Sequence, residues 1–76
     1  TVRLKTDLAS ARAALFDEIG LFQPVGDDVL LHSQVDDLDW YARQLARLPF
    51  GFTVVEPATL RQALRDLATR LRRFAR

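Results

Sequence analysis

A leucine repeat in the last third of the chain constrains the fold more than any other feature. Large apolar residues recur there at steps of four, three, four and three: Leu60, Leu64, Leu67, Leu71 and Phe74. At 3.6 residues per turn, these steps place all of them in one apolar seam along a single helix. Pro57 suits the first turn of this helix, and Glu56 or Thr59 offers an oxygen to its free amides. A seam of this length requires a surface that covers it.

The same helix carries a cationic flank beside the seam. At 100° per residue, four arginines fall within a sector of roughly 60°: Arg61, Arg65, Arg72 and Arg76. Residues 56–76 have a net charge of +4, whereas residues 1–55 have a net charge of −3. A charged helix face often does no more than keep a protein soluble. The asymmetry between the two parts nevertheless favours a polyanion or an acidic partner surface at the C-terminal end.

Length and composition narrow the class of protein. The chain has 76 residues, which predicts a single domain, 1–76, of a size at which one core gives marginal stability and self-association helps. It has no cysteine, so it has neither a disulfide framework nor a thiolate metal site, and it suits a reducing cytoplasm.

No apolar run approaches the ~20 residues that span a bilayer, and no signal peptide is evident. We therefore expect a soluble, cytoplasmic protein with no membrane partner. Because the chain has no methionine, we also expect it to be a fragment of a longer protein.

The first half of the chain predicts a strand, a helix and a hairpin. Apolar and basic residues alternate over residues 2–6, which is the pattern of a strand with one buried and one basic face. Residues 8–19 have helical spacing and predict about three turns. We expect Asp7 to cap this helix and Gly20 to end it in a left-handed conformation.

The hairpin follows directly. Residues 21–25 and 29–35 are predicted strands, joined by a turn at residues 26–28. Pro24 cannot donate a hydrogen bond to a neighbouring strand, so its strand belongs at a sheet edge.

The second half predicts a helix, a strand and then the long final helix. Asp36 or Asp37 caps a helix over residues 38–48, which the Pro-Phe-Gly sequence at 49–51 terminates. Residues 52–55 form the last strand.

This order of elements predicts an α+β domain. Two strand–helix–strand units in tandem (βαββαβ) form a four-stranded antiparallel sheet with both helices on one face, the ferredoxin-like plait, here with an additional C-terminal helix. The added helix can cross the open sheet face, pack at the sheet edge or dock on another copy. Its length favours the last arrangement, a homodimer that uses the apolar seam as its interface.

Sites known on folds of this kind can be tested against the residues. Stacking of RNA bases on the sheet requires exposed aromatic residues, but the expected outward positions hold Arg3, Lys5, His32 and Gln34. Hydrolysis of phosphate esters would require a glycine-rich loop after the first strand, and residues 6–9 contain no glycine.

The sequence shows no catalytic or metal-binding constellation. His32 is the only histidine, and it has no second ligand or nucleophile beside it, so it is expected to be a surface residue that could contact an anion with Arg3 and Lys5. Capping explains the carboxylates of residues 36, 37 and 39 without calcium. We therefore predict that the chain is not an enzyme and has no cofactor or metal.

One family resemblance joins these features. Residues 29–76 resemble the C-terminal extension, or WCX domain, of bacterial WYL-domain transcriptional regulators. The matching features are the strand VLLHSQV, the helix start DDLDW, the glycine before the last strand and the segment VVEPATLRQAL. The link at Pro49 and Phe50 departs from the plainer turn that is usual in the family. The resemblance implies a larger DNA-binding regulator whose winged helix-turn-helix and WYL domains lie upstream and are absent from this chain.

The resemblance also implies a role. Such extensions are associated with dimerisation and with sensing an effector, which in some members resembles single-stranded nucleic acid. By this analogy, the candidate anion- or nucleic-acid-binding residues are Arg3, Lys5, His32, Arg61, Arg65 and Arg72. The alternative is a small-molecule-sensing, ACT-like regulatory domain in which the arginines only solubilise the surface. Salt dependence separates the two, because binding to several phosphates weakens steeply as salt rises.

Overall fold

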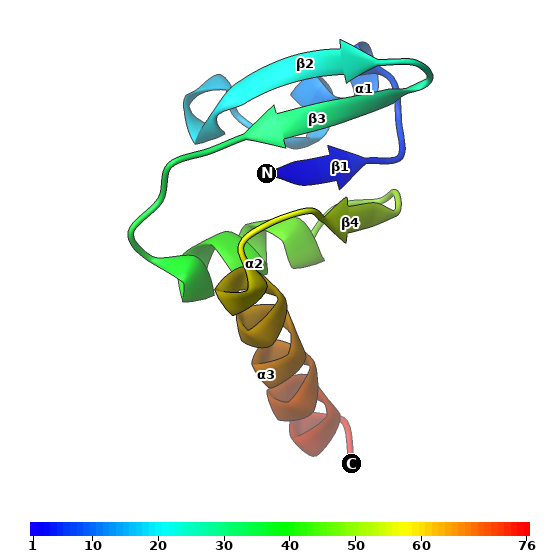
Figure 1. The fold of residues 1–76 in the computed structure, drawn as a ribbon. Coiled ribbons are helices and arrows are strands. Elements are labelled where there is room, and N and C mark those ends of the chain that lie inside the picture. The colour runs from blue at the N-terminus through cyan, green and yellow to red at the C-terminus, as the bar shows by residue number, and fades with distance from the viewer.

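The structure, a computed structural model, describes residues 1–76 apart from the side chain of Asp17. Its elements in chain order are β1 (Val2–Leu4), α1 (Leu8–Ala14), a 3-10 turn η1 (Asp17–Ile19), β2 (Leu21–Val25), β3 (Asp28–His32), α2 (Leu38–Ala46), β4 (Phe52–Val54) and α3 (Ala58–Phe74) (Figure 1). The predicted α+β domain, with a four-stranded antiparallel sheet and three α-helices, is confirmed. No helix among the described residues has the length and apolar character needed to cross a membrane.

The sheet is built around β1 and β3. The strand order is β2-β3-β1-β4, and each neighbouring pair is antiparallel. Val2 pairs with Leu31 on one side and with Val54 on the other. Pro24 lies on β2, an edge strand, as its missing N–H group predicts. The two-residue turn between β2 and β3 contains Gly26 at φ 59°, a conformation that glycine adopts without strain.

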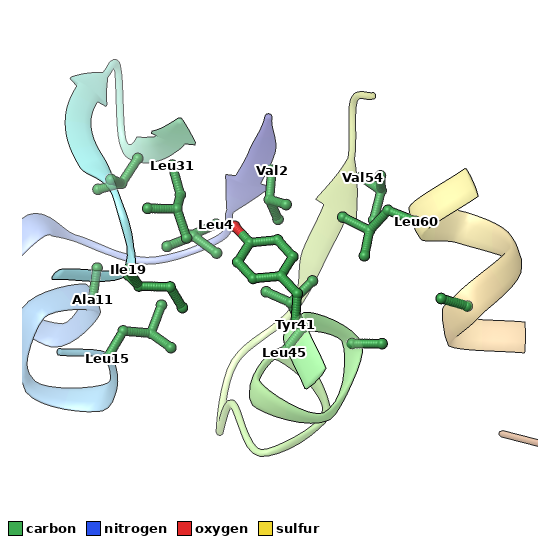
Figure 2. Packing of buried hydrophobic residues seen from close by; sticks show 13 residues of the cluster. Val2, Leu4, Ala11, Leu15, Ile19, Leu31, Tyr41, Leu45, Val54 and Leu60 are labelled. Atoms are coloured by element: carbon green, nitrogen blue, oxygen red, sulfur yellow. The ribbon is translucent and has the colours of Figure 1, made fainter. Parts of the chain in front are cut away.

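One face of the sheet forms the core with the helices. Val2 and Leu4 of β1 and Leu31 of β3 are fully buried, and they face Leu45 on α2 (Figure 2). Tyr41 lies in the same layer, and its hydroxyl group is 2.8 Å from that of Ser33. Burial raises the pKa of Tyr41, although the hydrogen bond with Ser33 opposes the shift. The core therefore contains one aromatic hydroxyl, and that hydroxyl has a partner.

The first helix is shorter than its apolar spacing predicts. α1 ends at Ala14, and Leu15 is extended with φ −128° and ψ 147°. Leu15 and Ile19 are nevertheless buried, at 6% and 3% exposure. The spacing thus identified core residues correctly but not the backbone that carries them. The chain turns back toward β2 here through the extended Leu15 and the 3-10 turn η1 rather than through a continuous helix.

The prediction that Gly20 ends this helix in a left-handed conformation is wrong. Gly20 is extended, at φ 161°. It is glycine because the backbone passes close to β3: a Cβ atom at this position would lie 2.3 Å from the carbonyl oxygen of His32 and 2.6 Å from Oγ of Ser33. The close approach of two segments of the backbone, rather than backbone handedness, therefore requires glycine here.

The predicted strand at residues 29–35 also ends early, at His32. The register explains why, because His32 pairs with Leu21, the first residue of β2, and Val2 pairs with Leu31. Beyond His32 no strand residue remains on either side to pair with. Gln34 is therefore not on the sheet. The last strand similarly ends at Val54 rather than at residue 55.

Side-chain caps are confirmed at two of the three helices. Oδ1 of Asp7 accepts a hydrogen bond from the backbone N–H of Ser10, and Oδ1 of Asp37 accepts one from that of Trp40. The hydrogen bonds from Ser10 lower the pKa of Asp7. The cap predicted for α3 is wrong, because Pro57 precedes the helix and no side chain caps it. This first turn is exposed, so water can satisfy its free amides.

α3 is longer than the surface on which it packs. Near its start, Leu60 and Ala63 are buried, at 1% and 8% exposure, and further along Leu64 and Leu67 pack against the core. Every residue from 68 to 76 is exposed. The last turns of α3 extend away from the sheet and from the other helices (Figure 1).

The close approach at Gly20 predicts a strong asymmetry between two glycine substitutions. Gly20→Ala should destabilise the domain by about 1–3 kcal/mol, because the new methyl group meets backbone atoms that cannot move away cheaply. Gly51→Ala should be nearly neutral, since its Cβ would contact only the Lys5 side chain, at 3.6 Å. Urea unfolding of both variants measures the difference, and equal midpoints would contradict this role of Gly20.

Candidate functional site

The open face of the sheet carries polar groups that largely bind one another. Nε of Arg3 donates to Oδ2 of Asp28 at 2.7 Å, and this ion pair is partly exposed. Nε2 of His32 lies 2.8 Å from Oε1 of Gln23. Nδ1 of His32 lies 3.4 Å from Oγ1 of Thr1. Arg3 and His32 therefore already have partners within the domain.

The structure does not gather the three predicted sheet residues into one pocket. His32 lies level with Thr1, and Lys5 follows the other end of β1, where its backbone N–H donates to the carbonyl of Gly51. Four residue steps along a strand separate these two levels by about 13 Å. His32 borders a hollow of about 520 Å³ next to Leu21, whereas Lys5 does not. These polar side chains are thus spread along the open face of the sheet and do not converge on one site.

Arg61 has a role that its place in the cationic flank does not reveal. Its Nη2 donates to the carbonyl of Val55 at 2.8 Å, and its Nε donates to that of Val54 at 3.3 Å. These carbonyls end β4, so the guanidinium group ties the first turns of α3 to the edge of the sheet.

Arg65 and Arg72 make no such hydrogen bonds to another element among the residues that the structure describes. Each is exposed, and each reaches only a neighbour on its own helix at 3.4 Å: Arg65 the side chain of Gln62, and Arg72 that of Thr69. Their guanidinium groups can therefore bind an anion without breaking a contact between elements. Of the three candidate arginines on α3, Arg61 is engaged by β4, whereas the guanidinium groups of these two stay exposed.

The predicted dimer seam divides into two parts. Leu60 belongs to the core of its own domain, and Leu64 and Leu67 are partly buried against it. Leu71 and Phe74 remain uncovered, at 52% and 79% exposure. The part of the seam that lies free for a partner is therefore its C-terminal end.

Sequence reasoning missed a groove on the other side of the seam. Between the start of α2 and the middle of α3 lies a hollow of about 320 Å³, bordered by Asp39, Asp66, Arg70 and Arg73. Asp39 lies in the first turn of α2, but the side-chain cap of that helix is Asp37. The only sign of this charged surface in the sequence is the spacing of Asp66 and Arg70, which lie four residues apart and therefore share one helix face. Among the described residues, no group of three or more His, Asp or Glu side chains could hold a metal ion.

Comparison with known proteins identifies a family. The family model described as the WCX domain matches residues 1–72. This match extends through β1, α1 and β2, beyond the residues that carried the resemblance in the sequence. Comparisons with curated proteins and with solved structures returned no significant match.

The contacts of Arg61 predict a difference between two neighbouring arginines. Arg61→Ala should destabilise the domain by roughly 1 kcal/mol, because two carbonyl groups at the end of β4 lose a charged donor. Arg65→Ala should change stability by less than about 0.5 kcal/mol, as is usual for an exposed residue without such contacts. Chemical unfolding checks both values. If the two variants are equally stable, Arg61 does not anchor α3.

Proposed function

The chain belongs to the WCX domain family, and from this premise we propose that it is the C-terminal dimerisation and effector-sensing module of a cytoplasmic, WYL-type, DNA-binding transcriptional regulator. WCX domains are regulatory C-terminal modules of such regulators. The observation that carries the proposal is the uncovered end of α3. It combines exposed apolar side chains with arginines whose only hydrogen bonds among the described residues are to their own helix.

The sheet supports the fold assignment that accompanies this proposal. The order β2-β3-β1-β4 has the first and third strands in the centre, as a βαββαβ chain requires when both of its helices cover the same face. We assign the domain to the ferredoxin-like plait on this basis. α3 is then an addition that leaves the plait at the edge strand β4.

Dimerisation explains the exposed end of α3. Leu71 and Phe74 continue the seam by which the first half of the helix packs on its own domain, but no part of the described chain covers them. An isolated stretch of two or three helical turns is marginally stable in water. Contact with a second copy would bury both side chains and stabilise these turns.

The arginines beside the seam suit an anionic effector. A guanidinium group can donate two parallel hydrogen bonds to a phosphate group. Arg65 and Arg72 are seven residues apart on one flank, about 10.5 Å along the helix, so both could contact one extended polyanion such as single-stranded nucleic acid. The sheet groups Arg3, Lys5 and His32 contribute less, since Arg3 and His32 have partners in the domain.

A charge at the exposed end of the seam should abolish the dimer. We expect wild-type protein to be dimeric at micromolar concentration in light scattering, Phe74→Glu to be a folded monomer, and Leu21→Glu to remain dimeric. Leu21 is the matched control because it is 76% exposed, similar to Phe74 at 79%, but lies on β2. Leu67 is unsuitable, since it packs against its own core. A monomeric wild type would remove the dimerisation proposal.

Effector binding should depend on salt and on two arginines. We expect a fluorescent single-stranded oligonucleotide to bind with an affinity that falls steeply with salt concentration. The double variant Arg65→Ala/Arg72→Ala should reduce the slope of log K against log salt by about 1.4, since each phosphate contact on a single strand contributes roughly 0.7.

The matched control for this titration is Arg12→Ala/Arg43→Ala, which removes the same charge from exposed positions on α1 and α2. It should leave the slope unchanged. An equal loss in both double variants would indicate binding through net charge alone. If the domain instead binds a small metabolite with little salt dependence, the small-molecule-sensing alternative is correct.

A further inference from the structure

We propose that the groove between α2 and α3 is a separate ligand site, which binds a small zwitterion: a free amino acid with an apolar side chain. The ammonium group of this ligand contacts Asp39 and Asp66, and its carboxylate group contacts Arg70 and Arg73. The site goes beyond the proposed function, because it requires neither a second copy of the chain nor the anion-binding flank of α3.

The groove is bordered by charges of both signs. Its volume is about 320 Å³, and its lining includes the carboxylates of Asp39 and Asp66 and the guanidinium groups of Arg70 and Arg73. Two negative and two positive side chains therefore surround one hollow, and the groove as a whole has no net charge.

These charged groups do not pair with one another. Asp66 and Arg70 have the spacing of an ion pair within a helix, yet the ion pair found among the described side chains joins Arg3 to Asp28 on the sheet. Oδ1 of Asp66 accepts a hydrogen bond from the Gln62 side chain, at 2.9 Å. Both signs of charge are thus available to groups of a ligand.

The mixture of charges selects the class of ligand. A simple anion in the groove would be repelled by Asp39 and Asp66, and a simple cation would be repelled by Arg70 and Arg73. A wholly apolar molecule would displace water from all four side chains without replacing its hydrogen bonds. A molecule with one ammonium and one carboxylate group is attracted by both pairs.

The positions of the charges along α3 orient the ligand. Asp66, Arg70 and Arg73 project within a sector of about 60°, and Arg73 lies about 10.5 Å beyond Asp66 along the axis. Asp39 lies in the first turn of α2, which packs beside the buried first half of α3. The ammonium group therefore points toward α2. The carboxylate group points toward the end of α3, where a guanidinium group can donate two parallel hydrogen bonds to it.

The floor and the size of the groove narrow the choice further. Ala63 and Leu67 also line the hollow, and Leu67 is only partly buried, so an aliphatic or aromatic side chain placed on it removes apolar surface from water. Pockets for drug-sized ligands have volumes of about 300–1,000 Å³. A groove of about 320 Å³ lies at the small end of this range and suits a single amino acid.

Titration with L-leucine, followed in amide NMR spectra, tests the site. We expect saturable shifts at the amides of Ala63 and Leu67. Leucinamide, which lacks the carboxylate group, and isocaproate, which lacks the ammonium group, should each bind at least about threefold more weakly, because each loses one of the two charge contacts. Glycine should also bind more weakly, since it has no side chain to cover Leu67.

Neutral variants of the groove provide the second test. Asp66→Asn and Arg70→Gln alter exposed positions, so both should fold, which circular dichroism verifies. Each should weaken leucine binding at least about threefold. The matched controls, Asp27→Asn and Arg12→Gln, remove the same charges from exposed positions that do not border the groove, and they should leave binding unchanged.

Three results would overturn the site: leucinamide or isocaproate binds as tightly as leucine, the control variants weaken binding as much as the groove variants, or neither leucine nor phenylalanine produces saturable shifts. The double variant Arg65→Ala/Arg72→Ala should retain leucine binding. Loss of leucine binding in this variant would place the ligand on the anion-binding flank and also overturn the site. If leucine binds but the protein is monomeric or does not bind the oligonucleotide, the groove site stands and the corresponding part of the proposed function fails.

Discussion

Burial of one face of the sheet is the constraint on which the rest of the domain depends. Val2 and Leu4 on β1 and Leu31 on β3 direct their side chains toward the layer of α1 and α2 (Figure 2). Val29 on β3 belongs to the same buried core. A shift of either strand by one residue would turn these side chains toward solvent, so the core fixes the register. Because α1 and α2 fill this face, α3 can pack only beside α2 and β4. This contact surface is too short to cover the whole helix.

The position of α3 accounts for the different roles of similar side chains along it. Near the sheet, Leu60 belongs to the core, and Arg61 is held by the carbonyls that end β4. Two to three turns later, Leu71 and Arg72 belong to the same stripe and the same flank, but both are exposed. Among the described residues, the Arg72 side chain hydrogen-bonds only to Thr69 of its own helix. Structural residues thus occupy the base of the helix, and residues available to partners occupy its end. This gradient is the physical basis of the proposed regulatory role.

Membership of the WCX family gives these surfaces a context. The proposed role, in which the module would join two copies and respond to an effector, requires two surfaces that do not compete. The seam end lies on one side of α3, and Arg65 and Arg72 lie on the other.

The sequence by itself determined the number and type of the main elements, the caps at Asp7 and Asp37, the edge position of Pro24 and the family. These features follow from local rules of periodicity, capping and turn chemistry. Only the tertiary structure decided where α1 ends, why residue 20 must be glycine, which part of the seam is covered and which arginines are engaged. The tertiary structure also decided that Asp39 borders the groove, because folding brings it near Asp66, which lies 27 residues later in the chain. Periodicity reports that a side chain is buried or exposed, but contacts between residues far apart in sequence decide which surface buries it and which partner it meets.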